Sequence, residues 1–266
     1  MMRTVSCRLD LLLESSAELI LSIAVRRDEG VVAERIEVTD GERPIAWREL
    51  VTANGSRLQL LDAGAGRVRV AYEATVGGTA EHTARQVGDA AELELLEYLR
   101  PSRYCESDLL LPTAAAEFAG VTGPPLLLAV GEWVHARLAY ESGSTGSTDG
   151  AADVLLARRG VCRDFAHLTI ALLRALDVPA RYLSVYAPGL SPMDFHAVAE
   201  AYVDGAWHVV DSTRLAPRQS LVRIATGRDA ADAAFLTHQG GALTLVGLEV
   251  MATVAGELPR DDHGTA

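Results

Sequence analysis

The sequence predicts an α+β protein in which an antiparallel β-domain precedes a mixed α and β domain. Three observations support this prediction. Before residue 76, short runs alternate apolar and polar side chains with period two, as in 67–73, which is typical of half-buried strands. Apolar residues then recur at helical spacing. Strand-like runs return after residue 181, and the 266 residues, 49% of them hydrophobic, suffice for one or two domains.

The N-terminal β-domain is expected to span residues 1–80. Gly77 and Gly78 end its last run, and a polar stretch follows them. Residues 81–97 are expected to form a linker that becomes helical, with the helix at 90–99 ending before Pro101. The expected strands of this domain are 19–25, 31–38, 45–50, 57–61 and 67–75.

The second domain is expected to span residues 98–258, followed by a polar, frayed tail at 259–266. Helices are predicted at 126–140, after Pro124 and Pro125, and at 162–176, before Pro179. A loop rich in Gly and Ser at 142–150 separates the two helices. The expected strands are 181–186, 195–203, 206–210, 220–225 and 243–254.

Charge and composition exclude several classes of function. The net charge is −12, and all 24 basic residues are Arg, so the phosphate backbone of a nucleic acid would be repelled. Five charged residues interrupt the first 25, which therefore match neither a secretion signal nor a membrane span. The three cysteines are sparse and odd in number, which fits reduced thiols. We expect a cytoplasmic protein without membrane contact.

No metal or cofactor site is expected. The sequence has no Cys-x-x-Cys pair, which excludes a zinc knuckle, and Asp149 and Asp153 are too few acidic residues for a calcium loop.

Cys162 is the cysteine whose position favours reactivity, because it begins the predicted helix 162–176. At a helix N-terminus the unpaired N–H groups and the positive end of the dipole favour the thiolate, which is the nucleophilic form. A free cysteine is otherwise most often a small buried hydrophobe, and we assign that role to Cys7 and Cys105. One face of the predicted helix carries Phe165, Leu168, Leu172 and Leu176.

A thiolate nucleophile needs a base, and a turn signal selects among the histidines. Asp204-Gly205 predicts a two-residue hairpin, whose register continues to pair residue 198 with Asp211. His196 and Asp211 are then diagonal neighbours on one face, where the carboxylate can hold the imidazole. His208 points to the opposite face. The seven histidines are His82, His135, His167, His196, His208, His238 and His263.

Cys162, His196 and Asp211 therefore form a nucleophile, a base and an orienting residue, in an order that suits acyl transfer through a thioester. From the residues alone, a second interpretation stands beside this one. A histidine next to an aspartate in a sheet is frequently only a satisfied polar pair.

Four sequence blocks resemble the bacterial transglutaminase-like superfamily, and the resemblance spans about residues 98–254. The blocks are GVCRDFAHL at 160–168, LRALDVPARY at 173–182, DFHAVAEAY at 194–202 and GAWHVVDST at 205–213. The resemblance implies a papain-like α+β core, in which the helix that presents Cys162 packs on an antiparallel sheet. It also implies that Cys162 is the nucleophile, His196 the general base and acid, and Asp211 the residue that orients His196.

The chain departs from the family pattern at two positions, Ser212 in place of a common Pro and Val198 in place of a common Trp. The resemblance further implies an oxyanion hole made by the backbone N–H of Cys162 and a second donor. Tyr104 and Tyr140 are candidates for that donor, and each is alternatively a core ring with a satisfied hydroxyl.

One further pair of polar residues and one further histidine receive structural interpretations. Asp164 and His167 lie one helical turn apart, and we expect an exposed i, i+3 pair rather than a part of the site entrance. His135, on the helix before the loop, is expected to be a partly exposed surface residue.

The expected function is thiol-dependent acyl transfer on an amide or peptide bond, so the expected partner is a peptide or protein amide. Hydrolysis is favoured over cross-linking, because water is always available and no site for an amine is evident. The alternative is a non-catalytic protein-binding module that keeps this fold. An intact Cys, His and Asp set argues against it, since a binding module does not need all three.

Overall fold

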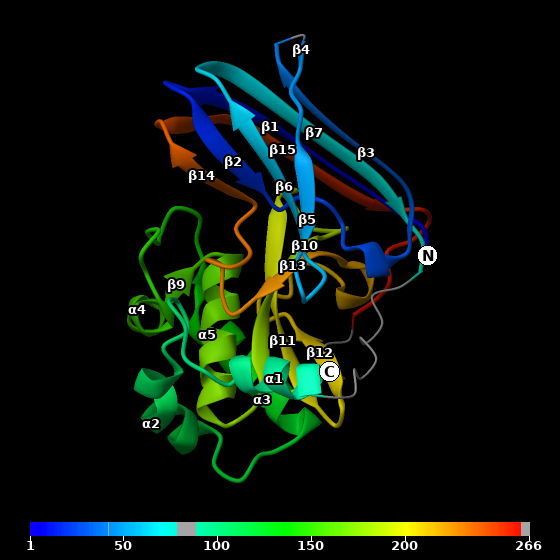
Figure 1. Ribbon diagram of the computed structural model, residues 1–266. Coiled ribbons are helices and arrows are strands. Elements are labelled where there is room, and N and C mark those ends of the chain that lie inside the picture. The colour runs from blue at the N-terminus through cyan, green and yellow to red at the C-terminus, as the bar shows by residue number, and fades with distance from the viewer. Residues whose placement is uncertain (42, 79–88, 262–266) are drawn as a thin grey trace.

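The computed structural model describes residues 1–41, 43–78 and 89–261, and its fold is α+β (Figure 1). N-terminal antiparallel sheets precede a core of helices packed on another antiparallel sheet, as the sequence predicted. The helices are α1 (Asp89–Glu97), α2 (Ser107–Glu117), α3 (Pro124–Arg137), α4 (Ala151–Ala157) and α5 (Cys162–Ala175). Within the described residues, no helix is both long and apolar enough to span a membrane.

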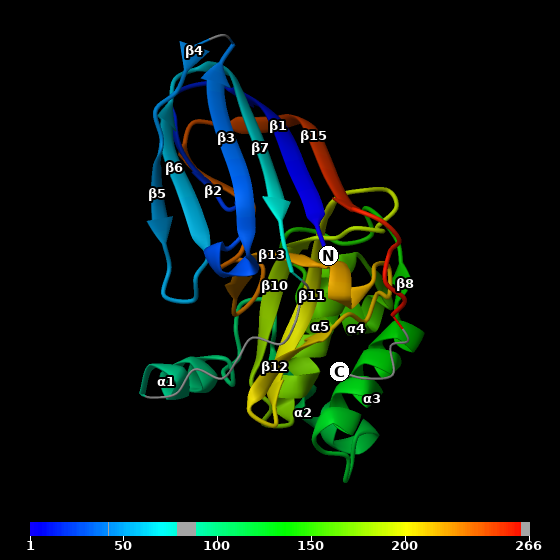
Figure 2. The same cartoon turned by 90° about the vertical axis from the view of Figure 1, so that its right-hand side faces the viewer.

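The N-terminal part consists of two sheets that face each other, and their strands occupy the upper part of Figure 2. Burial alternates strictly along β1 and β7, so their inward side chains fill the space between the sheets. One sheet has the order β15-β1-β7-β3-β4 and the other β14-β2-β6-β5. The strands that come from the N-terminal segment are β1 (Arg3–Leu13), β2 (Ala17–Leu21), β3 (Val31–Asp40), β4 (Arg43–Pro44), β5 (Arg48–Val51), β6 (Arg57–Ala63) and β7 (Gly66–Val76).

Two strands from the end of the chain complete these N-terminal sheets. β15 (Leu243–Val254) pairs with β1, and β14 (Leu236–Gly240) pairs with β2. Both lie within the range 98–258 that the sequence assigned to the second domain. Their pairing satisfies backbone N–H and C=O groups that β1 and β2 would otherwise expose at a sheet edge.

The second part of the fold contains a four-stranded antiparallel sheet with the order β12-β11-β10-β13. Helix α5 packs on β10 and β11, and α2, α3 and α4 pack on α5. Figure 1 shows α5 beside the sheet with the other helices around it. The strands are β10 (Ala180–Tyr186), β11 (Phe195–Val203), β12 (Ala206–Val210) and β13 (Val222–Gly227), and a separate parallel pair joins β8 (Ala139–Tyr140) to β9 (Arg159–Gly160).

The predicted helices at 90–99, 126–140 and 162–176 correspond to α1, α3 and α5, whereas α2 and α4 were not predicted. Residues 81–88 of the expected linker, and residues 79–80 before it, lie outside the described residues. The expected fraying of the tail is wrong for its first residues. The Asp261 side chain is buried against Arg218, which donates from its backbone and its guanidinium at 2.8 to 2.9 Å.

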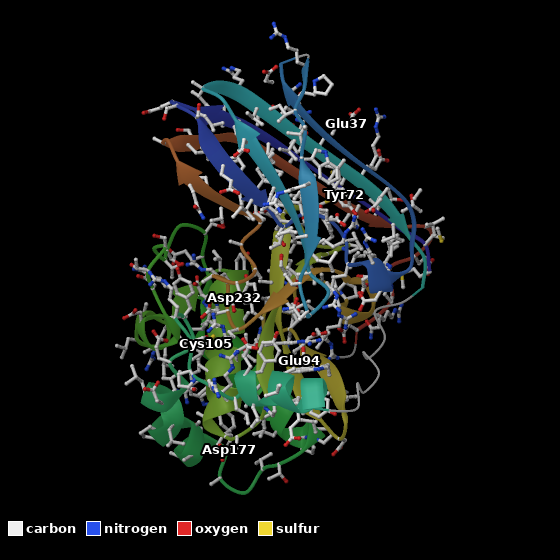
Figure 3. All side chains as sticks on the ribbon, in the orientation of Figure 1. Glu37, Tyr72, Glu94, Cys105, Asp177 and Asp232 are labelled. Carbon is white, nitrogen blue, oxygen red and sulfur yellow. The ribbon has the colours of Figure 1, made fainter. Side chains whose placement is uncertain are left out.

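A buried ionic cluster joins the N-terminal part to the core sheet. Glu200 on β11 is fully buried and pairs with Arg181 and Arg223, each at 2.8 Å. Arg223 also reaches Glu29 at 3.0 Å, in the short 3-10 helix Arg27–Glu29 that precedes β3. Glu94 on α1, labelled in Figure 3, pairs with Arg181 at 2.9 Å.

We expect Glu200→Gln to lower the free energy of unfolding by about 3 kcal/mol, because two buried guanidinium groups lose their shared counter-charge. Burial alone would raise the pKa of Glu200, but the charges of Arg181 and Arg223 lower it to about 2. Since this folded-state pKa lies below the unfolded value of about 4.3, the carboxylate stabilises the fold fully above that pH. The difference in free energy of unfolding between the wild type and Glu200→Gln is therefore lost as the pH falls toward 2.

Urea denaturation of both proteins between pH 2 and 7 measures this effect. Glu37→Gln is the matched control, because the Glu37 side chain is 52% exposed in its ion pair with Arg35, and it should change stability little (Figure 3). Equal costs for the two substitutions would contradict the assigned role of Glu200.

Candidate active site

Cys162 is the first residue of α5, and this residue is partly exposed. The turn that leads into the helix is fixed by Asp164, whose carboxylate accepts the backbone N–H of Val161 at 2.9 Å. Gly160 is required at this turn, because a Cβ there would lie 2.7 Å from the Cβ of Asp164. The helix therefore begins at Cys162, with its unpaired backbone N–H groups at the thiol.

Asp164 and His167 are not the exposed pair that the sequence predicted, because both side chains are fully buried. Helix α5 is surrounded by the sheet and by other helices, so that even its polar residues from 164 to 174 are covered. Asp164 also accepts the Thr145 hydroxyl at 2.6 Å. The His167 ring stacks on Tyr104, and its Nε2 accepts the backbone N–H of Ala230 at 3.1 Å.

His196 and Asp211 come together through the predicted hairpin. The register from Val203–Ala206 to Ala199–Val210 confirms the two-residue turn, and Asp211 directly follows the last pair. His196 Nε2 lies 3.2 Å from Asp211 Oδ2, and both side chains are buried. The carboxylate is therefore placed to hold the imidazole ring, as the diagonal pairing predicted.

Thr213 fixes the carboxylate of Asp211, a role that the sequence reasoning did not assign. Asp211 Oδ1 accepts the Thr213 backbone N–H at 2.9 Å and the Thr213 hydroxyl at 2.7 Å. Oδ2 is left for His196. The signal was available in the sequence, because an aspartate often accepts the backbone N–H two residues later in a turn.

Ser212 connects the Asp211 segment to the helix of Cys162. Its hydroxyl lies 2.7 Å from that of Thr169 on α5, in a buried hydrogen bond, and Thr169 also donates to the Phe165 carbonyl. The Ser212 carbonyl oxygen lies 2.9 Å from Nδ1 of His135, which is otherwise exposed as expected. The Ser212 side chain thus makes a hydrogen bond between α5 and the Asp211 segment that a proline side chain could not make. Val198 is buried in a small apolar cluster on the sheet.

The electrostatics of the site favour a protonated His196. Burial alone lowers its pKa, but the hydrogen bond with Asp211 and the interaction with Cys162 outweigh burial and raise the pKa to about 10. Burial tends to raise the pKa of Asp211, whereas His196 and Thr213 lower it below its ordinary value. The imidazole is therefore an imidazolium beside a carboxylate at neutral pH. Within the described residues, His196 Nδ1 has no hydrogen-bond partner.

The other two cysteines have the structural role that was predicted. Cys7 lies in β1 and Cys105, labelled in Figure 3, lies fully buried near α5. Burial raises the pKa of Cys7 to about 11 and that of Cys105 to about 12. Both thiols are therefore protonated at neutral pH, in contrast to what a nucleophile requires.

Of the other histidines, His208 is paired with Ala201 as predicted, and its Nε2 lies 3.1 Å from the Val203 carbonyl oxygen. His82 and His263 lie outside the described residues. Within residues 1–41, 43–78 and 89–261, no group of three or more His, Cys, Asp or Glu side chains is placed to hold a metal ion.

Comparison with known proteins places these features in a family context. Residues 125–212 match the family described as the transglutaminase-like superfamily. A crystal structure of a candidate cysteine protease from Cytophaga hutchinsonii is 35% identical, with a TM-score of 0.88, and the match covers 100% of this chain and 95% of that one.

Curated relatives match over shorter stretches. An uncharacterized protein of Mycobacterium leprae is 29% identical over 151 residues, which are 52% of this chain and 53% of that protein. An uncharacterized protein of Mycobacterium tuberculosis is 51% identical over 53 residues, which are 20% of this chain and 17% of that protein. The chain thus spans about half of the length of the Mycobacterium leprae protein.

We expect Asp211→Asn to lower the pKa of His196 from about 10 toward the ordinary value of about 6.5, because the amide no longer stabilises the imidazolium. An NMR titration of the His196 ring protons measures this pKa directly. Asp204→Asn is the control, since Asp204 has a φ of 51° in the hairpin turn, which Asn tolerates. An unchanged His196 pKa in the Asp211 variant would show that the carboxylate does not hold the charge of the ring.

Proposed function

Because the chain belongs to the transglutaminase-like superfamily, we propose that it transfers the acyl group of an amide or peptide bond through a thioester on Cys162. One arrangement carries this proposal. A partly exposed thiol lies at the start of α5 and interacts with His196, which is in turn hydrogen-bonded to Asp211 at 3.2 Å. A binding module would gain nothing from burying this charged pair beside a thiol.

Each residue has a role in the two halves of the reaction. The Cys162 thiolate attacks the carbonyl carbon, and the π electrons move onto the carbonyl oxygen. The oxyanion then collapses, the C–N bond breaks, and His196 gives its proton to the leaving amine. Water attacks the thioester while His196 takes its proton, and the thiolate leaves. Asp211 keeps the imidazole in one orientation throughout.

Hydrolysis is the proposed outcome, because Cys162 is partly exposed and no site for an amine is evident within the described residues. The substrate is proposed to be a peptide or a protein. Because the chain contains no lysine, no lysine side chain of its own can compete as an acyl acceptor. Incorporation of an added fluorescent primary amine therefore reports acyl transfer to an external amine.

We expect Cys162 to react with iodoacetamide faster than Cys7 and Cys105 at pH 6 to 7, because the other two thiols are buried and protonated. Limited alkylation of the folded protein, followed by peptide mass spectrometry, gives the three rates. Faster labelling of Cys7 or Cys105 would contradict the proposal.

His196→Ala should lower the turnover of a peptide substrate pool by about 10²-fold or more, because proton transfer and support of the thiolate are lost together. Release of new amino termini and of ammonia measures the turnover, and incorporation of the fluorescent amine measures transfer. His208→Ala is the matched control and should change the rate little, because His208 points away from Asp211 on the same hairpin. Loss of activity in the His208 variant alone would overturn the assignment.

A further inference from the structure

We propose that Asp194 is a specificity-determining residue, which binds a cationic side chain, arginine or lysine, on the leaving-amine side of the cleaved bond. This inference deepens the proposed function and rests on it. In the proposed reaction His196 gives its proton to the leaving amine. A charged group held beside His196 therefore meets the leaving part of the substrate.

The strand that carries His196 also positions Asp194. β11 begins at Phe195, which pairs with Tyr186 of β10, so Asp194 stands directly before the strand and two residues from His196. Residues two apart in an extended chain point to the same face and lie about 7 Å apart. His196 is buried, whereas Asp194 is exposed at the end of the strand. The carboxylate is thus within reach of a long side chain that neighbours an amine at His196.

The charge of Asp194 is not used by the fold. Its Oδ1 accepts the Phe195 backbone N–H at 2.7 Å. In the part of the chain that the structure describes, no arginine side chain forms an ion pair with this carboxylate. Burial raises the pKa of Asp194, although the Phe195 N–H and the charge of His196 lower it. A cation bound beside the carboxyl group would further favour its ionised form.

Asp194 also acts on the helix side of the thiol. Tyr140 pairs with Gly160, two residues before Cys162, so it lies at the start of α5. Burial and the charge of Cys162 raise the pKa of Tyr140 to about 12, and the charge of Asp194 adds to this shift. The carboxylate therefore lies close enough to influence groups on both the sheet and the helix.

The arginine next to the nucleophile does not oppose a cationic substrate strongly, because its own charge is paired. Arg163 lies 3.0 Å from the buried Asp164 carboxylate and donates to the Gly146 carbonyl at 2.9 Å. The net charge of −12 adds a long-range attraction for cations. An approaching guanidinium or ammonium group is thus drawn to the site, and Asp194 supplies its counter-charge there.

The residue that follows the cleaved bond gives the readout. The protein is incubated with a peptide pool, and mass spectrometry identifies the new amino termini, among which we expect arginine and lysine to be enriched. A cleaved sequence is then synthesised as a pair that carries either arginine or citrulline, its neutral counterpart, after the cleaved bond. The wild-type kcat/KM should be about fivefold higher for the arginine peptide, the size of a partly exposed ion pair.

Three variants separate recognition of charge from a structural role. Asp194→Asn should bring the ratio of the two kcat/KM values to about one, since Asn can still accept the Phe195 N–H but carries no charge. Asp194→Arg should invert the preference, so that glutamate after the cleaved bond is favoured over glutamine. Asp204→Asn, at the other end of β11, changes the net charge equally and should keep the wild-type ratio. A structural defect would slow both peptides alike and leave their ratio unchanged.

Each outcome of these measurements decides the inference. A wild-type ratio of one, or a ratio that survives Asp194→Asn, would overturn the inference and leave the proposed function standing. Release of ammonia without new amino termini would also overturn it, because that leaving group has no side chain. If the wild type releases neither, the proposed function and the inference fall together.

Discussion

The buried hydrogen bond between His196 and Asp211 is the interaction on which the rest of the site depends. A carboxylate that is almost wholly covered is costly unless each oxygen has a partner. Thr213 satisfies one oxygen through two hydrogen bonds, and His196 faces the other at 3.2 Å. Ser212 lies between Asp211 and Thr213 in the sequence, and its hydroxyl is hydrogen-bonded to that of Thr169 on α5. The placement of the ring and the placement of the thiol are thus parts of one hydrogen-bonded arrangement.

The sheet that carries His196 is also in contact with the N-terminal part of the chain. Glu200 on the same strand sits between Arg181 and Arg223, and Arg223 extends the cluster to Glu29. The Tyr186 hydroxyl adds a buried bond to the Ile23 carbonyl at 2.8 Å. These contacts join the N-terminal segment to the sheet that carries His196. The ion pairs of Glu200 thus hold the middle of β11, and the hydrogen bond between His196 and Asp211 holds the beginning of this strand.

Local signals in the sequence predicted the hairpin and the helix that begins at Cys162, whereas the long-range pairing of strands was not predictable. Asp204-Gly205 sets the register through turn geometry alone. The spacing of apolar residues in α5 predicted one buried face. It did not predict that Asp164 and His167, which lie on other faces of the helix, are buried too. Helix α2 contains Pro112, which disguises its pattern. The pairing of β15 with β1 joins segments more than 200 residues apart, and no local pattern encodes it.

The central claim is that an acyl group passes through Cys162, and trapping of the acyl-enzyme tests this claim most directly. The protein is incubated with a peptide substrate pool, quenched in acid, digested, and mapped by mass spectrometry. The account predicts an acyl group on the peptide that contains Cys162, which neutral hydroxylamine removes as it does a thioester. An acyl group on a hydroxyl residue, or on Cys7 or Cys105, would contradict the account.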